Sequence, residues 1–384
     1  MRRLNIFLLF LLVSVSLSAQ FVNNGATVTI QSGATLRVET DFINTSGTVT
    51  NNGTLEVQNN FTNSGTFTSA SGSTVKFIGD LASNVTSGSA VFQNVSLEKD
   101  AKDITLLDAM AVAGTLTFTN DNNKVILGTN NLTINAGGSI ASADENEYVV
   151  ADNTGQLIKG LTANGTITHE IGDAAKYSPL SSVVTGSAYS SATLGARVVD
   201  AVHPSKPADA DSYLSRYWVV NASGIIDYAN TMTGTYALSG DATGTTNDIK
   251  GATYHTADWH YNGSAANTGT PSVTASTTTA SVDLSGQNFF GRVNLKAYLQ
   301  GPYNPMTGLM STALNSTTPA NNLLEQFALI SPYPDASGSV SAGFFLANPT
   351  IVDWVKLELR DPSAPSTPTT NKACAFIKND GTIV

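Results

Sequence analysis

The sequence holds a single cysteine, Cys374, and charged residues make up only 12% of its 384 positions. One cysteine excludes an internal disulfide, so the fold must depend on backbone hydrogen bonds and side-chain packing. Cys374 stands between Ala373 and Ala375, which predicts a small buried side chain rather than a reactive thiol. Ordinary soluble proteins carry about 25% charged residues, so we expect a largely neutral surface.

Basic residues are scarce as well, because 19 Lys and Arg stand against 29 Asp and Glu and give a formal net charge of -10. Nucleic acid and anionic lipid bind to basic patches, so neither is an expected partner. The motifs H-E-x-x-H, G-x-S-x-G and C-x-x-C and the phosphate-binding P-loop are all missing from the sequence. Each of them supports a known catalytic chemistry. We therefore predict a protein without enzymatic activity, catalytic residues or a cofactor.

Long apolar runs are also lacking, apart from residues 6–13, which follow Arg2 and Arg3 and precede small residues ending at Ala19. This run is shorter than the roughly 20 residues that a membrane-spanning helix needs. Its layout is that of a secretory signal peptide. We predict that residues 1–19 are a signal peptide and that the mature chain starts at Gln20. The mature chain is expected to lack a transmembrane segment and to reside outside the cell or on its outer surface.

What the chain does have is a repeat rich in Gly, Thr and Asn. Apolar residues recur at intervals of 19, 20, 20 and 21 residues at Leu36, Leu55, Val75, Val95 and Leu116. Each has an apolar partner two residues later, which is the alternation of a strand with one face inside. Phe42, Phe61 and Leu81 repeat at a similar spacing and predict a second face with the same register.

Glycines and Asn pairs stand where this repeat must turn. Gly33, Gly53 and Gly72 precede strands, and Asn pairs at 51–52, 59–60, 122–123 and 130–131 suit the same corners because both residue types tolerate positive φ. The stacked Asn side chains are expected to bond from one coil to the next. We predict a parallel β-helix (β-solenoid) of about 20 residues per coil over residues 20–145. Residues 20–24 and the segment after Ile140 are expected to cover its ends.

Two other architectures have a similar period. A leucine-rich repeat is disfavoured because its L-x-x-L-x-L-x-x-N signature is missing and no helix-length apolar stripe lies between the strands. An array of small β-meanders remains the alternative.

The rest of the chain is predicted to be antiparallel, so the whole is an all-β protein. Short alternating segments at 192–199, 216–220, 234–238, 257–261 and 280–284 predict a β-sandwich-like region over residues 146–295. Strands at 295–299, 353–361 and 373–377 predict a further β domain over residues 296–384. The hairpin turn Asn379-Asp380-Gly381 is followed by only three residues, so we expect this domain to be truncated and the chain to be part of a longer protein.

Several segments resemble those of large secreted surface proteins of Bacteroidota, which are often described as adhesin-like or hemagglutinin-like. The segments are His169-Glu170-Ile171-Gly172-Asp173, Tyr177-Ser178-Pro179, Ser215-Arg216-Tyr217-Trp218, 296–304, Gly308-Leu309-Met310-Ser311 and Val352-Asp353-Trp354-Val355. The resemblance spans nearly the whole chain and implies a Gly-Thr-rich solenoid and export by type IX secretion. The group usually has Pro-Val-Gly-Asp where this chain has Glu170-Ile171-Gly172-Asp173.

Few residues qualify as metal ligands. His255 and His260, with Asp258 between them, are predicted to point to opposite faces of one strand, which disfavours a shared metal. Two loops offer oxygen ligands for weak calcium binding, although neither has the spacing of an EF-hand. These loops contain Asp209 and Asp211, and Asn120, Asp121, Asn122 and Asn123.

The remaining candidate residues concern catalysis and sugar binding. Solenoids include polysaccharide lyases, which need clustered acids and an Arg or Lys base, but the bases here are scattered at Arg37, Lys76, Lys99, Lys102 and Lys124. Exposed aromatic rings stack on sugars, and the possible platforms are Tyr189, Tyr254, Tyr261 and Tyr303. Glycans or other surface proteins are the expected partners.

Two functions follow from the sequence. The favoured one is a secreted structural or adhesive surface protein, with the solenoid as stalk or binding face. The alternative is a carbohydrate-binding or processing module of a larger glycan-degrading protein.

Overall fold

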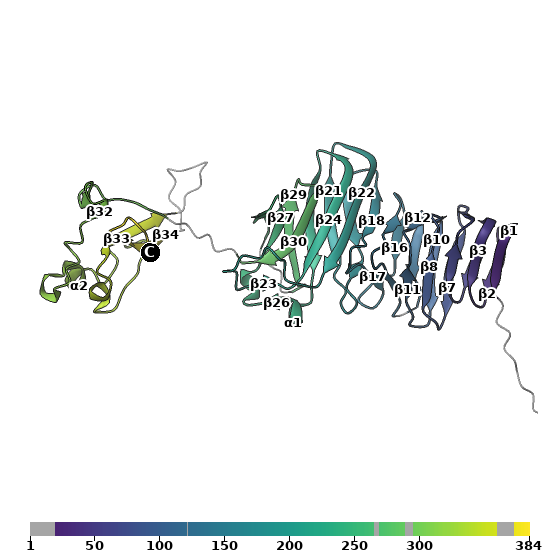
Figure 1. Cartoon of the computed structure of the whole chain (residues 1–384), viewed down its shortest axis with the longest axis horizontal. Helices are drawn as coiled ribbons and strands as arrows, with labels where there is room; N and C mark the ends of the chain where they lie inside the picture. Colours follow the sequence, from purple (N-terminus) through teal and green to yellow (C-terminus); the bar gives the residue numbers. More distant parts are fainter. Residues whose placement is uncertain (1–19, 121, 265–268, 289–294, 359–371) are drawn as a thin grey trace, which may run out of the picture. The chain divides into compact units, whose positions relative to one another are not determined.

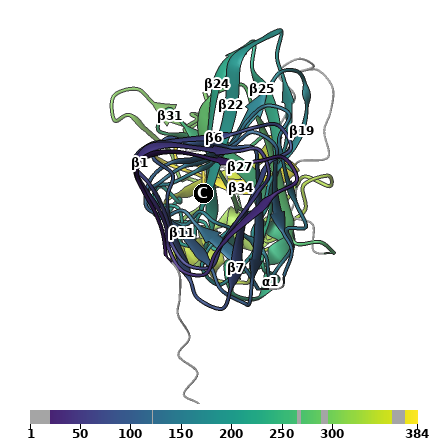
Figure 2. The same cartoon turned by 90° about the vertical axis from the view of Figure 1, so that its right-hand side faces the viewer.

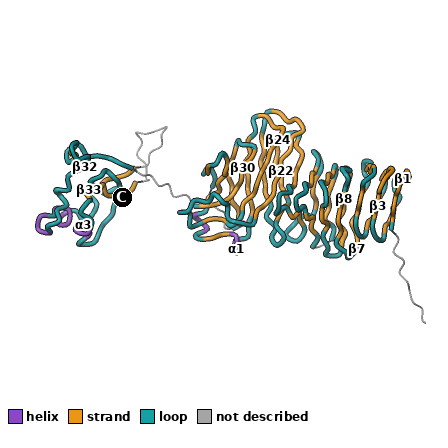
Figure 3. Tube along the Cα trace, viewed as in Figure 1, coloured by secondary structure: helices purple, strands orange, loops and turns teal. Residues whose placement is uncertain are grey.

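The computed structural model describes residues 20–120, 122–264, 269–288, 295–358 and 372–384 (Figure 1). The predicted signal peptide, 1–19, lies outside these residues. The chain divides into two compact units, Met1–Phe290 and Gly291–Val384. Strands dominate the described residues, and the helices are short (Figure 3).

The first unit begins with a parallel β-solenoid of about seven turns between residues 21 and 172. Seen from its N-terminal end, the coils overlap in a three-sided outline (Figure 2). One face consists of the parallel strands β1 (Phe21–Ile30), β3 (Phe42–Asn51), β5 (Phe61–Asn63), β8 (Ser83–Thr86), β11 (Ile104–Leu106), β14 (Lys124–Ile126), β17 (Tyr148–Val150) and β20 (Ile171–Gly172).

A second face, hereafter the ion-pair face, consists of β2 (Thr35–Val38), β4 (Thr54–Val57), β7 (Thr74–Gly79), β10 (Asn94–Lys99), β13 (Thr115–Phe118) and β16 (Ser139–Ala141). The third contains β9 (Val91–Phe92), β12 (Met110–Val112), β15 (Leu132–Ile134) and β18 (Leu157–Leu161). On this third side β6 (Thr66–Ser69) pairs with the second half of β3 and lies beside β9.

The predicted apolar column is confirmed, because its members are direct partners across the ion-pair face. Leu36 pairs with Leu55, Leu55 with Val75, Val75 with Val95, and Val95 with Leu116. Glycine at the corners allows this close stacking. A Cβ on Gly53 would lie 2.3 Å from the carbonyl oxygen of Ala34 in the preceding coil.

The second predicted column is right only in part. The rings of Phe21, Phe42 and Phe61 stack with centroids 5.0 and 4.8 Å apart. The next partner of Phe61 is Val85 rather than Leu81, whose side chain is 53% exposed. Extra residues lengthen the turn before β8, so the 20-residue spacing selects the wrong side chain.

The solenoid continues past the predicted boundary at residue 145. Val149 pairs in parallel with Val125 on one side and with Ile171 on the other, which adds a further coil. Residues 20–24 do not cover the N-terminal end, because Phe21 to Asn24 already pair with β3 as the first strand.

At its other end the solenoid passes directly into a β-sandwich. Strand β18 pairs in parallel with β15 and antiparallel with β22 (Ala188–Val199). The third face therefore extends into a mixed sheet, hereafter the shared sheet. Its further strands are β24 (Tyr217–Ile226), β30 (Ser281–Gln287), β27 (Lys250–His255), β28 (Asp258–His260), β23 (Tyr213–Leu214) and β26 (Ala242–Thr243).

A four-stranded antiparallel sheet, hereafter the outer sheet, packs on the shared sheet. It consists of β19 (Gly165–His169), β21 (Leu180–Thr185), β25 (Ala229–Thr235) and β29 (Ser272–Thr277). Trp218 is fully buried between the sheets and donates a hydrogen bond from its indole nitrogen to the carbonyl of Ser178 at 2.9 Å. Its ring faces Gly234, where any Cβ would lie 2.6 Å away. The strand predicted at 234–238 ends at Thr235 and is followed by the short helix α1 (Leu238–Asp241).

The second unit contains two β-hairpins and short helices. Strand β33 (Ile351–Glu358) pairs with β34 (Lys372–Lys378), and β31 (Tyr303–Asn304) pairs with β32 (Leu309–Met310). The short helices include α2 (Leu323–Phe327) and α3 (Phe344–Ala347). The strand predicted at 295–299 is wrong and reduces to one bridge between Lys296 and Thr382. Cys374 is half-buried beside the cluster that contains Trp354.

Candidate functional site: an uncharged hydroxyl face

The outer sheet presents one face composed almost entirely of hydroxyl side chains. Its strands alternate, so Leu180, Val184, Met232 and Val273 point into the core. The outward positions, hereafter the hydroxyl face, are Thr166, Thr168, Ser181, Val183, Thr185, Ala229, Thr231, Thr233, Thr235, Ser272, Thr274 and Ser276. The four strands contain no Lys, Arg, Asp or Glu.

The strand pairing places these hydroxyls in rows across the sheet. One row contains Thr168, Ser181, Thr233 and Thr274, and the next contains Thr166, Val183, Thr231 and Ser276. Neighbouring hydroxyls bond to each other at 2.9 Å between Thr231 and Ser276 and at 2.9 Å between Thr233 and Thr274. The rows therefore form an ordered network.

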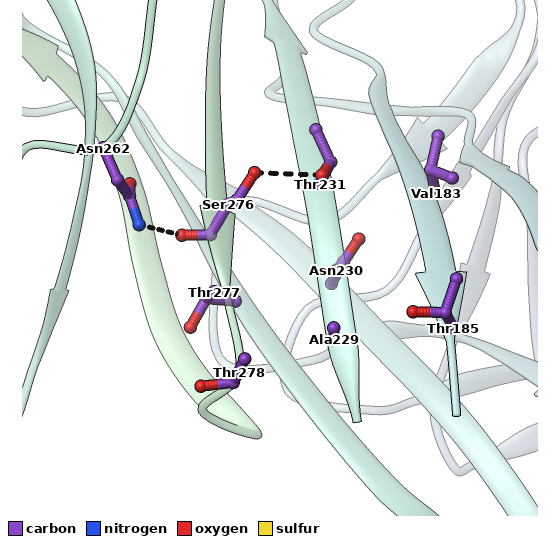
Figure 4. Close-up of a pocket in the computed structure, with 9 residues that line it drawn as sticks. All are labelled: Val183, Thr185, Ala229, Asn230, Thr231, Asn262, Ser276, Thr277 and Thr278. Carbon is purple, nitrogen blue, oxygen red and sulfur yellow. Dashed lines mark hydrogen bonds between the residues drawn. The ribbon is translucent and has the colours of Figure 1, made fainter. Parts of the chain in front are cut away.

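A shallow groove of about 310 Å³ lies at one edge of this face (Figure 4). Figure 4 shows Asn262 beside Ser276, and the Asn262 amide donates to the Ser276 carbonyl. The groove is lined by Val183, Thr185, Ala229, Asn230, Thr231, Asn262, Ser276, Thr277 and Thr278. Its volume is at the lower end of the range for small-molecule sites. Hydroxyls donate and accept hydrogen bonds, so this lining matches a neutral ligand rich in hydroxyl groups.

Of the four predicted tyrosine platforms, Tyr254 and Tyr261 lie beside Trp259, Tyr189 is on β22, and Tyr303 is in the second unit. Tyr254 packs against the buried ring of His203, with centroids 4.7 Å apart, and Trp259 packs on both. His203 also lies 3.0 Å from the carboxylate of Asp283, and the Trp259 indole donates to the carbonyl of Ser205 at 2.8 Å. The loop that carries His203 thus covers these rings as a small core on the shared sheet.

The other three tyrosines have different surroundings. Tyr261 lies next to Trp259, with ring centroids 6.5 Å apart, and accepts a hydrogen bond from Gln287. Tyr189 donates its hydroxyl hydrogen to Asn164 at 2.5 Å, and Tyr303 is in the second unit. Sequence reasoning missed the hydroxyl face, although its strands are visibly rich in Thr and Ser.

The predicted placement of His255 and His260 is wrong. The chain turns at Thr256 and Ala257, both with positive φ, and so places the two histidines on adjacent strands. Their rings stack with centroids 3.9 Å apart. Burial, together with the neighbouring His260, lowers the pKa of His255. Among the described residues, no three His, Cys, Asp or Glu side chains gather in a way that could hold a metal ion.

The loops proposed for weak calcium binding are engaged in other contacts. Asp211 accepts a hydrogen bond from Asn288 at 2.6 Å, whereas Asp209 is exposed. The amides of Asn120 and Asn123 both donate to the carbonyl of Lys99, at 3.2 and 3.0 Å, and Asn122 donates its backbone N–H to Glu147. Asp121 lies outside the described residues.

The scattered bases of the solenoid have structural contacts. Lys99 is fully buried and donates to the carbonyls of Gln58 and Ile78 at 3.0 and 2.8 Å, and burial lowers its pKa to about 8. Arg37 and Lys76 form ion pairs on the ion-pair face. Lys124 lies over the ring of Tyr148 at 5.1 Å, and Lys102 is exposed.

The strongest charge cluster surrounds Arg216, whose side chain is fully buried. Its guanidinium contacts the carboxylates of Asp173 at 2.5 Å, Asp200 at 3.0 Å and Asp241 at 3.0 Å. Lys176 adds a second cation on Asp241 at 2.5 Å. Burial opposes ionisation of Asp173, but hydrogen bonds from the Ala175 backbone and from Arg216 hold its pKa below the usual value.

This cluster joins the last coil of the solenoid to the sandwich. Asp173 follows β20, whereas Arg216 precedes β24. Arg216 and Asp241 are completely buried, and Asp173 is 5% exposed. The cluster therefore has a structural role.

Comparison with known proteins finds no family model that matches the chain, and no curated protein or solved structure matches it. Within the described ranges, no helix is long and apolar enough to cross a membrane.

Proposed function

We propose that this chain is an exported, non-catalytic adhesive protein of the cell surface. In this proposal the solenoid is a rigid support, and the hydroxyl face contacts neutral polyhydroxylated ligands such as glycans. The observation that supports it is the outward surface of β19, β21, β25 and β29, which has ordered hydroxyls and no charged side chain. The apolar run behind Arg2 and Arg3 supports export.

The lack of charged side chains explains why this face suits a glycan. Most exposed protein surfaces include charged side chains that keep neighbouring molecules apart. The hydroxyl face offers paired donors and acceptors instead, and Val183 at 48% exposure adds an apolar contact for the C–H side of a sugar ring. The groove at Thr231 and Ser276 gives one recessed position within the array.

Binding can be measured with the mature chain and immobilised galactomannan, dextran and xyloglucan, with polygalacturonate as a charged comparator. We expect saturable binding to at least one neutral polymer. Thr231→Arg places a long charged side chain in the middle of the face and should weaken that binding at least tenfold. Thr35→Arg changes an exposed threonine on the ion-pair face and is the matched control.

Two results would contradict the proposal. One is a lack of saturable binding to all three neutral polymers, and the other is an equal loss of affinity in both variants. Depolymerisation of a bound polysaccharide by the purified protein would instead support the alternative, a processing module of a glycan-degrading protein.

A further inference from the structure

A second ordered surface lies at the N-terminal end of the solenoid, on β1, β3 and β6. Each strand contains a Thr-x-Thr segment, and the three segments are in register. Thr27 pairs with Thr48 and Thr48 with Thr66, while Thr29 pairs with Thr50 and Thr50 with Thr68. The result is an array of two threonine columns over three coils, hereafter the threonine array.

The central residue of each segment anchors the array. Val49 and Phe67 are buried in the core and Val28 packs against it, so the flanking threonines must point outward. Threonine is stiff about χ1, and Thr68 donates to the hydroxyl of Thr50 at 3.2 Å. The six side chains are thus held in repeating positions.

The threonine array carries no charged side chain, whereas the ion-pair face of the solenoid does. The outward column on β9, β12 and β15 contains Val91, Ala111 and Thr133. On the ion-pair face the same coils carry ion pairs between Arg37 and Glu56 at 3.5 Å and between Lys76 and Glu98 at 3.0 Å. The neutrality of the threonine array is therefore a local property rather than a consequence of the low overall charge.

The array repeats in two directions. Neighbouring strands are about 4.8 Å apart, and alternate residues along a strand are about 6.7 Å apart. A two-dimensional repeat matches a periodic solid better than a single molecule. The two spacings are close to the oxygen repeats on the prism face of hexagonal ice. The six-residue array offers no aromatic ring that could stack on a sugar ring.

We infer that the threonine array binds ice through an ordered layer of water. The six hydroxyls hydrogen-bond water at positions set by the strands. The threonine methyl groups lie between these hydroxyls and form no hydrogen bonds, so the water between the hydroxyls meets no competing charged group. The inference is independent of the hydroxyl face and concerns different strands.

The experiment is partition of the mature protein into a slowly growing ice front, followed by measurement of thermal hysteresis. We expect the protein to be enriched in the ice fraction and to depress the freezing point below the melting point. Thr48→Lys, in the middle coil, should reduce the ice-bound fraction at least fivefold. Thr54→Lys, in the same coil but on the ion-pair face, should leave it unchanged.

Circular dichroism and the unfolding midpoint establish that each variant is folded. If Thr48→Lys does not fold, Thr27→Lys replaces it, since Thr27 is exposed on the first strand. Exclusion of the wild-type protein from ice, or an equal loss in the Thr48 and Thr54 variants, would overturn the inference. If the Thr48→Lys variant loses ice binding but still binds polysaccharide, the threonine array and the hydroxyl face act independently.

Discussion

His169 ends β19, and its imidazole is completely buried. Its Nε2 lies 2.9 Å from the carbonyl oxygen of Leu194, which can only accept, so Nε2 carries the proton. Nδ1 has no partner among the described residues. Burial, assisted by the positive charge of Lys159, lowers the pKa of His169 to about 3. The folded protein therefore keeps this histidine neutral.

This predicts that the first unit loses stability in mild acid. Below its ordinary pKa of about 6.5, the histidine of the unfolded chain takes up a proton that the folded chain cannot bind. The contribution of the neutral histidine to the free energy of unfolding is complete above that pKa. It falls by about 2 kcal/mol between pH 7 and pH 5. Urea denaturation at both pH values measures it.

His169→Gln is the control for this prediction. Glutamine keeps a donor for the Leu194 carbonyl but does not titrate. Between pH 7 and pH 5, the free energy of unfolding of this variant should fall by about 2 kcal/mol less than that of the wild type. An unchanged pH dependence would mean that other groups cause the acid effect.

Between strands, buried asparagines connect the first coils. Asn23 donates to Asn44 at 2.9 Å, Asn44 donates to Asn63 at 2.7 Å, and Asn63 donates to the carbonyl of Ser87 at 2.9 Å. Among the asparagines predicted to bond from coil to coil, Asn51, Asn123 and Asn130 do so to backbone carbonyls, and Asn60 does so to the carboxylate of Asp41. The amide-to-amide stack forms instead at Asn23, Asn44 and Asn63, which are direct partners on neighbouring strands.

Asn44→Ala should destabilise the solenoid by about 1–3 kcal/mol, because the Asn23 donor and the Asn63 acceptor both lose a buried partner. Chemical denaturation of the full chain measures the change. Asn24→Ala is the matched control, since Asn24 is exposed and accepts a hydrogen bond from Ser46 at the surface. Its effect should stay within about 0.5 kcal/mol. Equal effects of the two variants would argue against the internal ladder.

Across the whole first unit, the solenoid and sandwich share one hydrophobic core. The buried cluster extends from Ile30 through Leu132 and Leu194 to Leu284 without a break. The Arg216 cluster closes the junction, because it connects Asp173 after the last coil with Asp241 at the end of α1. We therefore expect the two parts to unfold together.

Arg216→Met should destabilise this unit by about 3–5 kcal/mol, because it leaves the buried carboxylate of Asp173 without its cation and leaves Asp241 with Lys176 alone. The loss should appear as a lower midpoint in thermal unfolding. Arg37→Met is the control, since Arg37 is exposed and its pairs with Glu39 and Glu56 lie at the surface. An exposed pair contributes about 0–1 kcal/mol. A small effect of the Arg216 change would show that the junction depends on the shared sheet alone.

The sequence by itself determined the all-β class, the coil repeat and the register of the Leu36 column. These features follow from period-two alternation and spacing along the chain. Only the tertiary structure decided the hydroxyl face, the stacked histidines and the Arg216 cluster. Thr231 bonds to Ser276, 45 residues away, and Arg216 contacts Asp173, 43 residues away. Alternation sets which side chains point outward, but long-range strand pairing sets which of them become neighbours.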